Sequence, residues 1–226
     1  MSKAIITSIR LWFFYLICEG LKPDEIRKSA PKESNLNNYF YISKTNAERD
    51  LAKIPSEKRG YYKKFIGKVG GKFIYGKVTR YQSEFWDNKT YECIREIYEP
   101  DDFDEYGEYG FYHIAANGDE NEVCRRSCLS WNELRDYVGE GIKEFYAWHI
   151  SNLVVYDEPL NLGEFYKVGY FDELSHLLSS QADYIGMGCY SNHEDEFNKM
   201  FDDLDDEYRI KRPPQSWQYV ERKDGV

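Results

Sequence analysis

The sequence predicts an α+β protein, a small mixed β-barrel with short helices, formed as one domain over residues 1–226 with an acidic helical insertion at 163–210. Strand-like runs rich in β-branched and aromatic residues are interleaved with short segments of helical pattern. Aromatic residues make up 17% of the chain, including 21 Tyr, and this content excludes a disordered protein. A chain of this length buries about 70% of its unfolded surface, so no disulfide is needed to hold it together.

The N-terminal elements are predicted to be a strand and a buried helix. Residues 4–9 read AIITSI, which is typical of a β-branched strand, and Gly20 is a good stop for the helix that follows. The apolar run at 11–18 is too short for a membrane span, and Glu19 follows it without a small-residue cleavage site, so we expect neither a signal peptide nor a membrane anchor. One face of this helix carries Leu11, Phe14, Tyr15 and Cys18.

The middle of the chain is predicted to alternate between strands and polar connections. A short extended segment follows Gly20, and a second strand reads NNYFYIS at 37–43. A polar, Lys-rich connection at 44–64 then leads to a strand at 67–83, in which Gly70-Gly71 indicates a turn or a bulge.

The second half of the chain is predicted to contain both helices and strands. Ser130 with Glu133 three residues later matches the capping box that begins a helix. Two helical patterns fill the insertion, and a double proline precedes the last strand. The predicted order is an acidic loop at 100–110, a helix at 130–141, a strand at 145–157, the two helices, and a closing strand at 212–221.

Charge is unevenly distributed along the chain. Residues 1–80 hold 17 Lys+Arg and 7 Asp+Glu, a net charge of +10, whereas residues 81–226 hold 13 and 33, a net charge of −20. The fold could therefore present a basic face and an acidic face, or it could mix the two signs. The five cysteines show no metal-ligand spacing, so we expect no metal, no cofactor and a reduced, cytoplasmic environment.

Three charged residues beside the first helix form the main candidate site. Glu25 and Arg27 are two apart on an extended segment and share a face, while Lys22 lies in the turn before them. Such a cluster can bind a base edge or a phosphate, or it can shift pKa values enough for proton transfer. From spacing alone, a structural ion pair of Glu25 with Arg27 or Lys28 is the preferred explanation of these residues.

Together with Gly20, these residues carry a family resemblance. Gly20, Lys22, Glu25 and Arg27 match G-x-K-x-x-E-x-R, the signature of the ASCH domain, a branch of the PUA-like barrel superfamily. The stretches AWHISNLVVYDEP and RPPQSWQYVE resemble ASCH proteins encoded by prophages of Gram-positive bacteria. The resemblance covers residues 4–43, 67–83, 129–166 and 212–226.

The resemblance implies a nucleic-acid or nucleotide role, with RNA or a modified nucleoside held in a cleft lined by the signature residues. One type of ASCH protein is an amidohydrolase that deacetylates acetylcytidine. It looks similar around Lys22 and Arg27, but it uses a threonine where this chain has Glu25. A carboxylate does not replace a hydroxyl as acyl acceptor without changing the chemistry, so hydrolysis of a modified nucleoside stays an alternative function.

Five more residues are candidate ligand contacts. His149 and Ser151 share a strand face, and a neutral imidazole can hydrogen-bond a ligand or move a proton. Trp148 faces the other way and either stacks on a base or packs in the core. Gln215 and Trp217 follow the rigid double proline, where they either contact a base or close the fold.

The acidic segments suggest a different kind of partner. The stretches EIYEPDDFDEYGE and HEDEFNKMFDDLDDEYR contain seven and eight acids, mixed with Tyr or Phe. A solvated face explains them, and so does a surface that mimics the charge of DNA. With the prophage resemblance, this suggests as a further alternative a phage inhibitor of a host nuclease or defence complex, similar in role to an anti-CRISPR protein.

Overall fold

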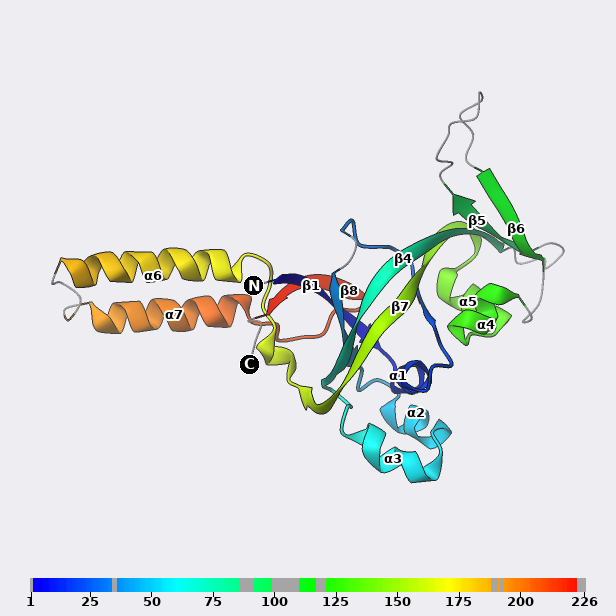
Figure 1. Cartoon of the computed structure of the whole chain (residues 1–226), viewed down its shortest axis with the longest axis horizontal. Coiled ribbons are helices and arrows are strands. Elements are labelled where there is room, and N and C mark those ends of the chain that lie inside the picture. The colour runs from blue at the N-terminus through cyan, green and yellow to red at the C-terminus, as the bar shows by residue number, and fades with distance from the viewer. Residues whose placement is uncertain are drawn as a thin grey trace. The chain divides into compact units, whose positions relative to one another are not determined.

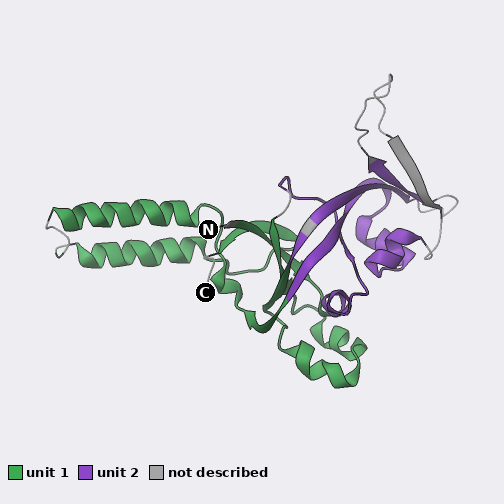
Figure 2. Cartoon of the chain, in the orientation of Figure 1, with its two compact units in different colours: residues 1–11, 36–72, 155–226 green, residues 12–35, 73–154 purple. Residues whose placement is uncertain are grey.

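The computed structural model describes residues 2–33, 36–85, 92–98, 110–116, 121–187, 191 and 193–222 (Figure 1). The chain divides into two compact units: unit 1 consists of Met1–Leu11, Leu36–Lys72 and Val155–Val226, and unit 2 of Trp12–Asn35 and Phe73–Val154 (Figure 2). Within the described residues, no helix combines the length and the apolar character that crossing a membrane requires.

Unit 1 is organised around its first strand. Strand β1 (Ser2–Ile9) pairs in parallel with β3 (Asn37–Ile42) and antiparallel with β8 (Trp217–Arg222). Alternation along the strands sends every second side chain to the same face. The resulting core contains Ala4, Ile6, Tyr39, Tyr41, Val69, Phe165, Ile210 and Val220.

The helices of unit 1 correct one sequence prediction. The predicted polar connection at 44–64 contains two short helices, α2 (Ala47–Lys53) and α3 (Ser56–Lys63). Tyr62 of α3 is buried, and so are Ile54 and Phe65, which follow α2 and α3 in the chain. The segment predicted to be an insertion contains the two expected helices, α6 (Tyr170–Gly186) and α7 (Glu194–Tyr208), after a short 3-10 turn, η1 (Leu162–Glu164).

Unit 2 combines one sheet with three helices. Its helices are α1 (Leu11–Cys18), α4 (Glu122–Ser127) and α5 (Trp131–Val138), of which α1 begins one residue before the unit. Its sheet order is β2-β7-β4-β5-β6, and β4 and β7 continue along the chain into unit 1. The strands are β2 (Asp24–Arg27), β4 (Val69–Phe85), β5 (Cys93–Tyr98), β6 (Gly110–Ala116) and β7 (Gly141–Leu160).

One face of this sheet carries the core of unit 2. The predicted capping box is confirmed: the Ser130 hydroxyl accepts from the Glu133 amide at 3.2 Å, and the Glu133 carboxylate accepts from the Ser130 amide at 3.0 Å. Helix α5, which begins at this capping box, packs its apolar side onto the strands. The core includes Ile26, Tyr81, Phe85, Trp131, Leu134 and Phe145.

The α+β class is confirmed, and the described strands form a mixed, open sheet of eight strands. The sequence predicts a barrel, whereas pairing among the described strands leaves the sheet open. Gly70-Gly71 makes no turn and lies inside β4. The acidic loop predicted at 100–110 falls almost entirely outside the described residues. The boundaries predicted for one domain with an insertion remain a prediction.

Candidate functional site

The loop between α1 and β2 positions the predicted signature residues. Gly20 ends the helix with φ 72°, a left-handed conformation that glycine adopts without strain. The Leu21 amide then donates to the Leu16 carbonyl at 2.9 Å, and the Gly20 amide to Ile17 at 3.0 Å, as in a Schellman motif. This stop turns the chain sharply and places Lys22 two residues before β2.

The three predicted charged residues of this loop and strand meet, and all three are buried. Glu25 Oε1 lies 2.8 Å from Arg27 Nη2, and Glu25 Oε2 lies 3.5 Å from Lys22 Nζ. Their side chains are 2–8% exposed. Because side chains alternate along β2, Ile26 between them enters the apolar core. One carboxylate thus stands between two cations with little access to water.

Lys22 is held by more than this ion pair. Its Nζ donates to the Ser127 carbonyl at the end of α4 at 2.5 Å, and it lies 5.0 Å from the ring centroid of Phe13. Burial lowers the pKa of Lys22, and the nearby Glu25 carboxylate opposes that shift without cancelling it. The ammonium is therefore costly to keep charged, as at sites that use a lysine chemically.

One oxygen of Glu25 is held only loosely. Its Oε2 is buried, and its contact with Lys22 Nζ is a long one, at 3.5 Å. A buried carboxylate oxygen in this state costs free energy unless another donor reaches it. The exocyclic amine of a nucleobase is a donor of that kind.

A second charged network uses the opposite face of β2. The Asp24 carboxylate binds Arg126 of α4 in a bidentate manner, at 2.6 and 2.7 Å, and lies 2.7 Å from His149 Nδ1. Burial alone would raise the pKa of Asp24, but the hydrogen bonds from His149 and Arg126 outweigh it and lower that pKa. The carboxylate is therefore ionised at neutral pH.

An ionised Asp24 decides which nitrogen of His149 carries the proton. For a neutral ring, Nδ1–H donates to Asp24, and Arg126 Nη2 at 3.2 Å from Nδ1 is then a close contact without a hydrogen bond. The lone pair of Nε2 accepts from the Thr79 hydroxyl at 2.8 Å. Asp24, His149 and Thr79 thus form one chain of hydrogen bonds across β2, β7 and β4.

We call Lys22, Asp24, Glu25, Arg27, Arg126 and His149 the charged cluster. It holds three bases and two acids, so its formal charge is +1 with a neutral His149. Arg126 and His149 are the accessible members, with side chains 33% and 22% exposed. An anionic group approaching the cluster meets these two side chains first.

Of the other predicted residues, Trp148 lies beside Glu25, whereas Ser151, Gln215 and Trp217 have other partners or another place. Trp148 is fully buried directly opposite Glu25 in the β2–β7 register, so its side chain is on the same face of the sheet as Glu25. The Ser151 hydroxyl donates to the Ile74 carbonyl at 2.5 Å. Gln215 and Trp217 belong to unit 1, where Trp217 pairs with Thr7 of β1.

Sequence reasoning missed three members of this region: Asp24, Thr79 and Arg126. Asp24 stands next to Glu25, and the alternation that puts Glu25 and Arg27 on one face implies that Asp24 faces the other. Thr79 and Arg126 gave no local signal, because their contacts join positions 70 and 102 residues apart.

Comparison with known proteins gives a limited likeness. No model of a known protein family matches the chain, and no curated protein matches it. The chain is similar to the crystal structure of ASCH from Zymomonas mobilis, with 15% identity over 96% of this chain and 87% of that one and a TM-score of 0.39. It is also similar to a Tyr-to-Phe mutant of that protein, with 16% identity over 97% and 91% and a TM-score of 0.40.

Proposed function

We propose that this chain is an ASCH-type protein that binds RNA or a nucleotide-like ligand at the charged cluster of unit 2. The observation that carries the proposal is the Glu25 carboxylate, which is buried between two cations and whose Oε2 makes only a long contact, 3.5 Å, with Lys22 Nζ. The exocyclic amine of a base would supply a hydrogen bond to this oxygen. The match of Gly20, Lys22, Glu25 and Arg27 to the ASCH signature supports the same ligand class.

The accessible members of the cluster suit the charged end of such a ligand. Arg126 has a planar guanidinium at the surface, which matches the geometry of a phosphate. His149 lies beside it and offers a ring for stacking or a nitrogen for hydrogen bonding. The formal charge of +1 favours an anion over a neutral sugar.

The test begins with what the purified chain carries. Mass spectrometry of copurifying small molecules and RNA identifies the ligand class, and titration with nucleosides, nucleotides and short RNA then gives affinities. Arg126→Gln should weaken binding by about tenfold, the loss expected for one charge-assisted contact. Arg125→Gln is the matched control, because Arg125 lies on the same helix with its side chain 70% exposed.

Lys22→Met tests the buried side of the cluster. Ligand retention should be lost while the circular dichroism spectrum stays that of the natural chain. Equal retention by Lys22→Met, Arg126→Gln and the natural chain would contradict the proposal, and so would the absence of any bound nucleotide or RNA.

A second candidate function is hydrolysis of an acylated nucleoside, favoured by the chain Asp24–His149–Thr79. The Thr79 oxygen would attack the acyl carbon while His149 Nε2 takes the hydroxyl proton and passes it to the leaving amine or alcohol. Water, activated by the same nitrogen, would then release the acid and restore Thr79. Asp24 would hold the imidazole in the required tautomer.

Turnover separates this candidate from simple binding. A panel of acylated nucleosides should yield free acid with the natural chain and none with Thr79→Val, which keeps the shape of the side chain. Ser83→Ala is the control, because Ser83 has a buried hydroxyl on the same strand, bonded to the Lys143 carbonyl. Binding without product, or equal product from Thr79→Val, excludes the hydrolase.

A phage origin and a cytoplasmic location remain predictions of the sequence. The same holds for a host nuclease or defence complex as partner of the acidic segments.

A further inference from the structure

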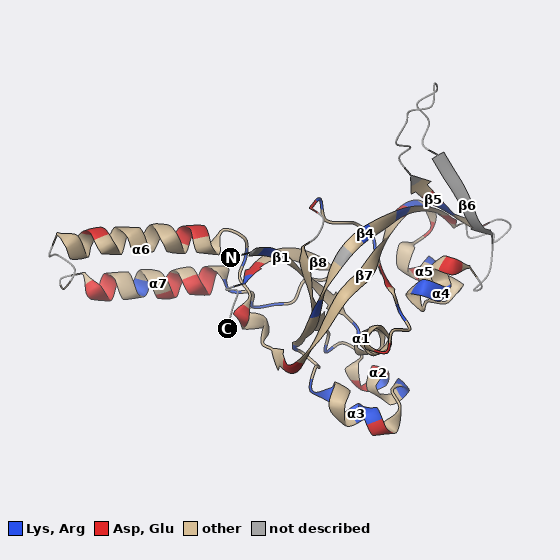
Figure 3. Ribbon diagram, viewed as in Figure 1, with Lys and Arg blue, Asp and Glu red and all other residues tan. Residues whose placement is uncertain are grey.

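The most extreme charge in the chain lies on helices α6 and α7 of unit 1. They pack against each other as a hairpin, here called the acidic hairpin (170–208). It contains 11 Asp+Glu and one Lys, a net charge of −10, which equals the net charge of the whole chain. The charges of all other residues therefore sum to zero. Acidic residues occur on both helices and are densest on α7 (Figure 3).

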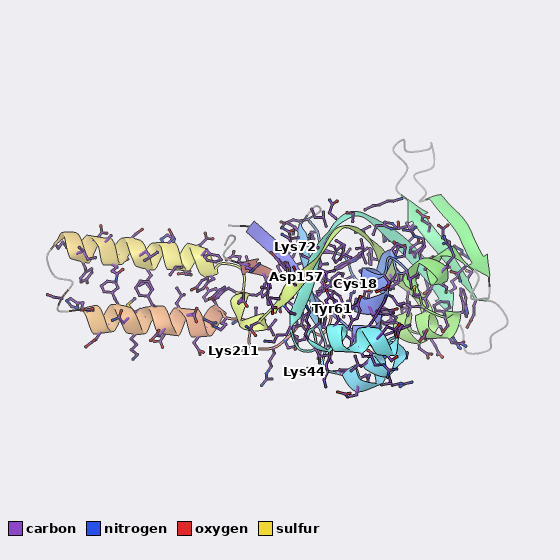
Figure 4. All side chains as sticks on the ribbon, turned by 60° about the horizontal axis from the view of Figure 1, so that its bottom comes forward. Cys18, Lys44, Tyr61, Lys72, Asp157 and Lys211 are labelled. Atoms are coloured by element: carbon purple, nitrogen blue, oxygen red, sulfur yellow. The ribbon has the colours of Figure 1, made fainter. Side chains whose placement is uncertain are left out.

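The hairpin is also unusually apolar on its outside. Phe197 is buried against Tyr184, with ring centroids 5.3 Å apart, and Leu177 is buried in the same seam. Two helices can bury only the stripes that face each other, and side chains of both also project outward (Figure 4). Of the ten large hydrophobic side chains exposed among the described residues, five belong to the hairpin: Leu178, Tyr184, Ile185, Met187 and Met200.

A groove of about 400 Å³ lies between the two helices. It is lined by the apolar side chains of Leu177, Met200 and Leu204 and by the acids Glu173, Asp203 and Glu207. Leu178 and Ile185, 49% and 55% exposed, are seven residues apart on α6 and lie on the side of that helix that faces away from the groove.

We propose that the acidic hairpin is a docking element for a basic protein surface that carries exposed apolar side chains. The partner's apolar groups fill the groove, while its Lys and Arg face the acidic side chains that line it. Exposed apolar patches rimmed by charge are typical of protein interaction sites, and charge sets which partner they accept.

The negative charge of the acidic hairpin excludes other classes of binding partner. Nucleic acid and anionic lipid surfaces are repelled by a net charge of −10, and so is the same hairpin of a second copy. The basic segment 44–72 of a second copy, with nine Lys+Arg and three Asp+Glu, is the remaining alternative. The inference does not depend on the ligand proposed for the charged cluster, because the hairpin belongs to unit 1.

The test uses synthetic helical peptides of matched length with the full chain. One peptide is amphipathic with Lys and Leu, one replaces Leu by Ala, and one replaces Lys by Glu. Fluorescence anisotropy should show binding of the Lys/Leu peptide, at least about tenfold weaker binding of the Lys/Ala peptide, and none of the Glu/Leu peptide. The affinity should fall as salt rises.

Two double variants separate the apolar from the charged contribution. Met200→Ser with Leu204→Ser, two apolar residues that line the groove, should weaken binding of the Lys/Leu peptide by at least about fivefold without changing its salt dependence. Glu173→Gln with Asp203→Asn should weaken it and flatten the salt dependence. The control is Ile142→Ser with Val154→Ser, two apolar side chains of unit 2 that are 55% and 44% exposed.

Two results would overturn the proposal. Equal binding of the Lys/Leu and Lys/Ala peptides, or no effect of Met200→Ser with Leu204→Ser, would reduce the hairpin to a solvated acidic face. Salt-sensitive self-association in sedimentation velocity, abolished by Lys63→Gln with Lys64→Gln, would assign the surface to a second copy instead of a different protein.

Discussion

The charged cluster of unit 2 and the acidic hairpin of unit 1 use the same residue types under opposite conditions. In the cluster, the four buried members are Lys22, Asp24, Glu25 and Arg27. Lys22 and Arg27 both pair with Glu25 within 4 Å, and Asp24 is hydrogen-bonded to Arg126 and His149. In the hairpin, Asp202 and Asp203 are exposed and pair with no described residue.

The difference separates two roles of charge. A buried charge deprived of its partner must be desolvated without compensation, so each member of the cluster matters to folding. An exposed carboxylate is solvated by water, so single acids of the hairpin matter little to folding and act through their sum. Substitutions in the two regions should therefore differ in free energy of unfolding and in salt dependence.

Glu25→Gln should have the largest effect on stability. It leaves Lys22 and Arg27 buried without an anion, which typically costs about 3–5 kcal/mol of unfolding free energy. Urea titration measures the loss. Glu144→Gln is the control, because Glu144 pairs with Arg80 at the surface and exposed pairs contribute about 0.2–1 kcal/mol. If Glu25→Gln loses no more unfolding free energy than Glu144→Gln, the ion pairs of Glu25 with Lys22 and Arg27 do not stabilise the fold.

Asp24→Asn should have the next largest effect, and its effect should depend on pH. The lowered pKa of Asp24 means that its ionised form stabilises the fold above its usual pKa of 3.8, and that this contribution is lost as pH falls through the folded-state pKa. At pH 7 the variant should lose about 1–3 kcal/mol, as for other charged hydrogen bonds. As pH decreases, the unfolding free energies of the natural chain and of Asp24→Asn should converge. A constant difference between them down to pH 2 would contradict this assignment.

Lys22→Met should cost less than Glu25→Gln, about 1–2 kcal/mol from the lost bond to the Ser127 carbonyl. Burial lowers the pKa of Lys22 below 10.5, so the unfolded chain binds this proton more readily and the charged lysine opposes folding. The stability of the natural chain relative to Lys22→Met should therefore rise with pH as pH increases through the folded-state pKa toward 10.5. If the relative stability falls over that pH range, the pKa of Lys22 is raised by folding and not lowered.

Asp202→Asn with Asp203→Asn should have the smallest effect. The unfolding free energy should change by no more than about 0.5 kcal/mol, and a small gain is expected because like charges are removed. Thermal melts at low and high salt measure it, and the gain should vanish at high salt as screening takes over. A marked loss of stability would mean that these acids have partners in the fold, which would remove the contrast with the cluster.

The sequence predicted local features well and long-range ones poorly. The stop at Gly20, the shared face of Glu25 and Arg27, and the capping box at Ser130 follow from backbone conformation and periodicity within a few residues. The helices α2 and α3 were hidden because lysines dominate the composition of a segment whose buried residues are few. Arg126 could not be found, because only tertiary structure brings it to Asp24.

The connectivity of the charged cluster has a consequence for how the protein is made. Lys22 bonds to a residue 105 positions later, and Asp24 to residues 102 and 125 positions later. A ribosome-bound chain that has emerged only as far as β4 therefore carries this loop with its charges still in water. We expect the loop to order only after β7 has left the ribosome, so that nascent chains released before that point are protease-sensitive and chaperone-dependent.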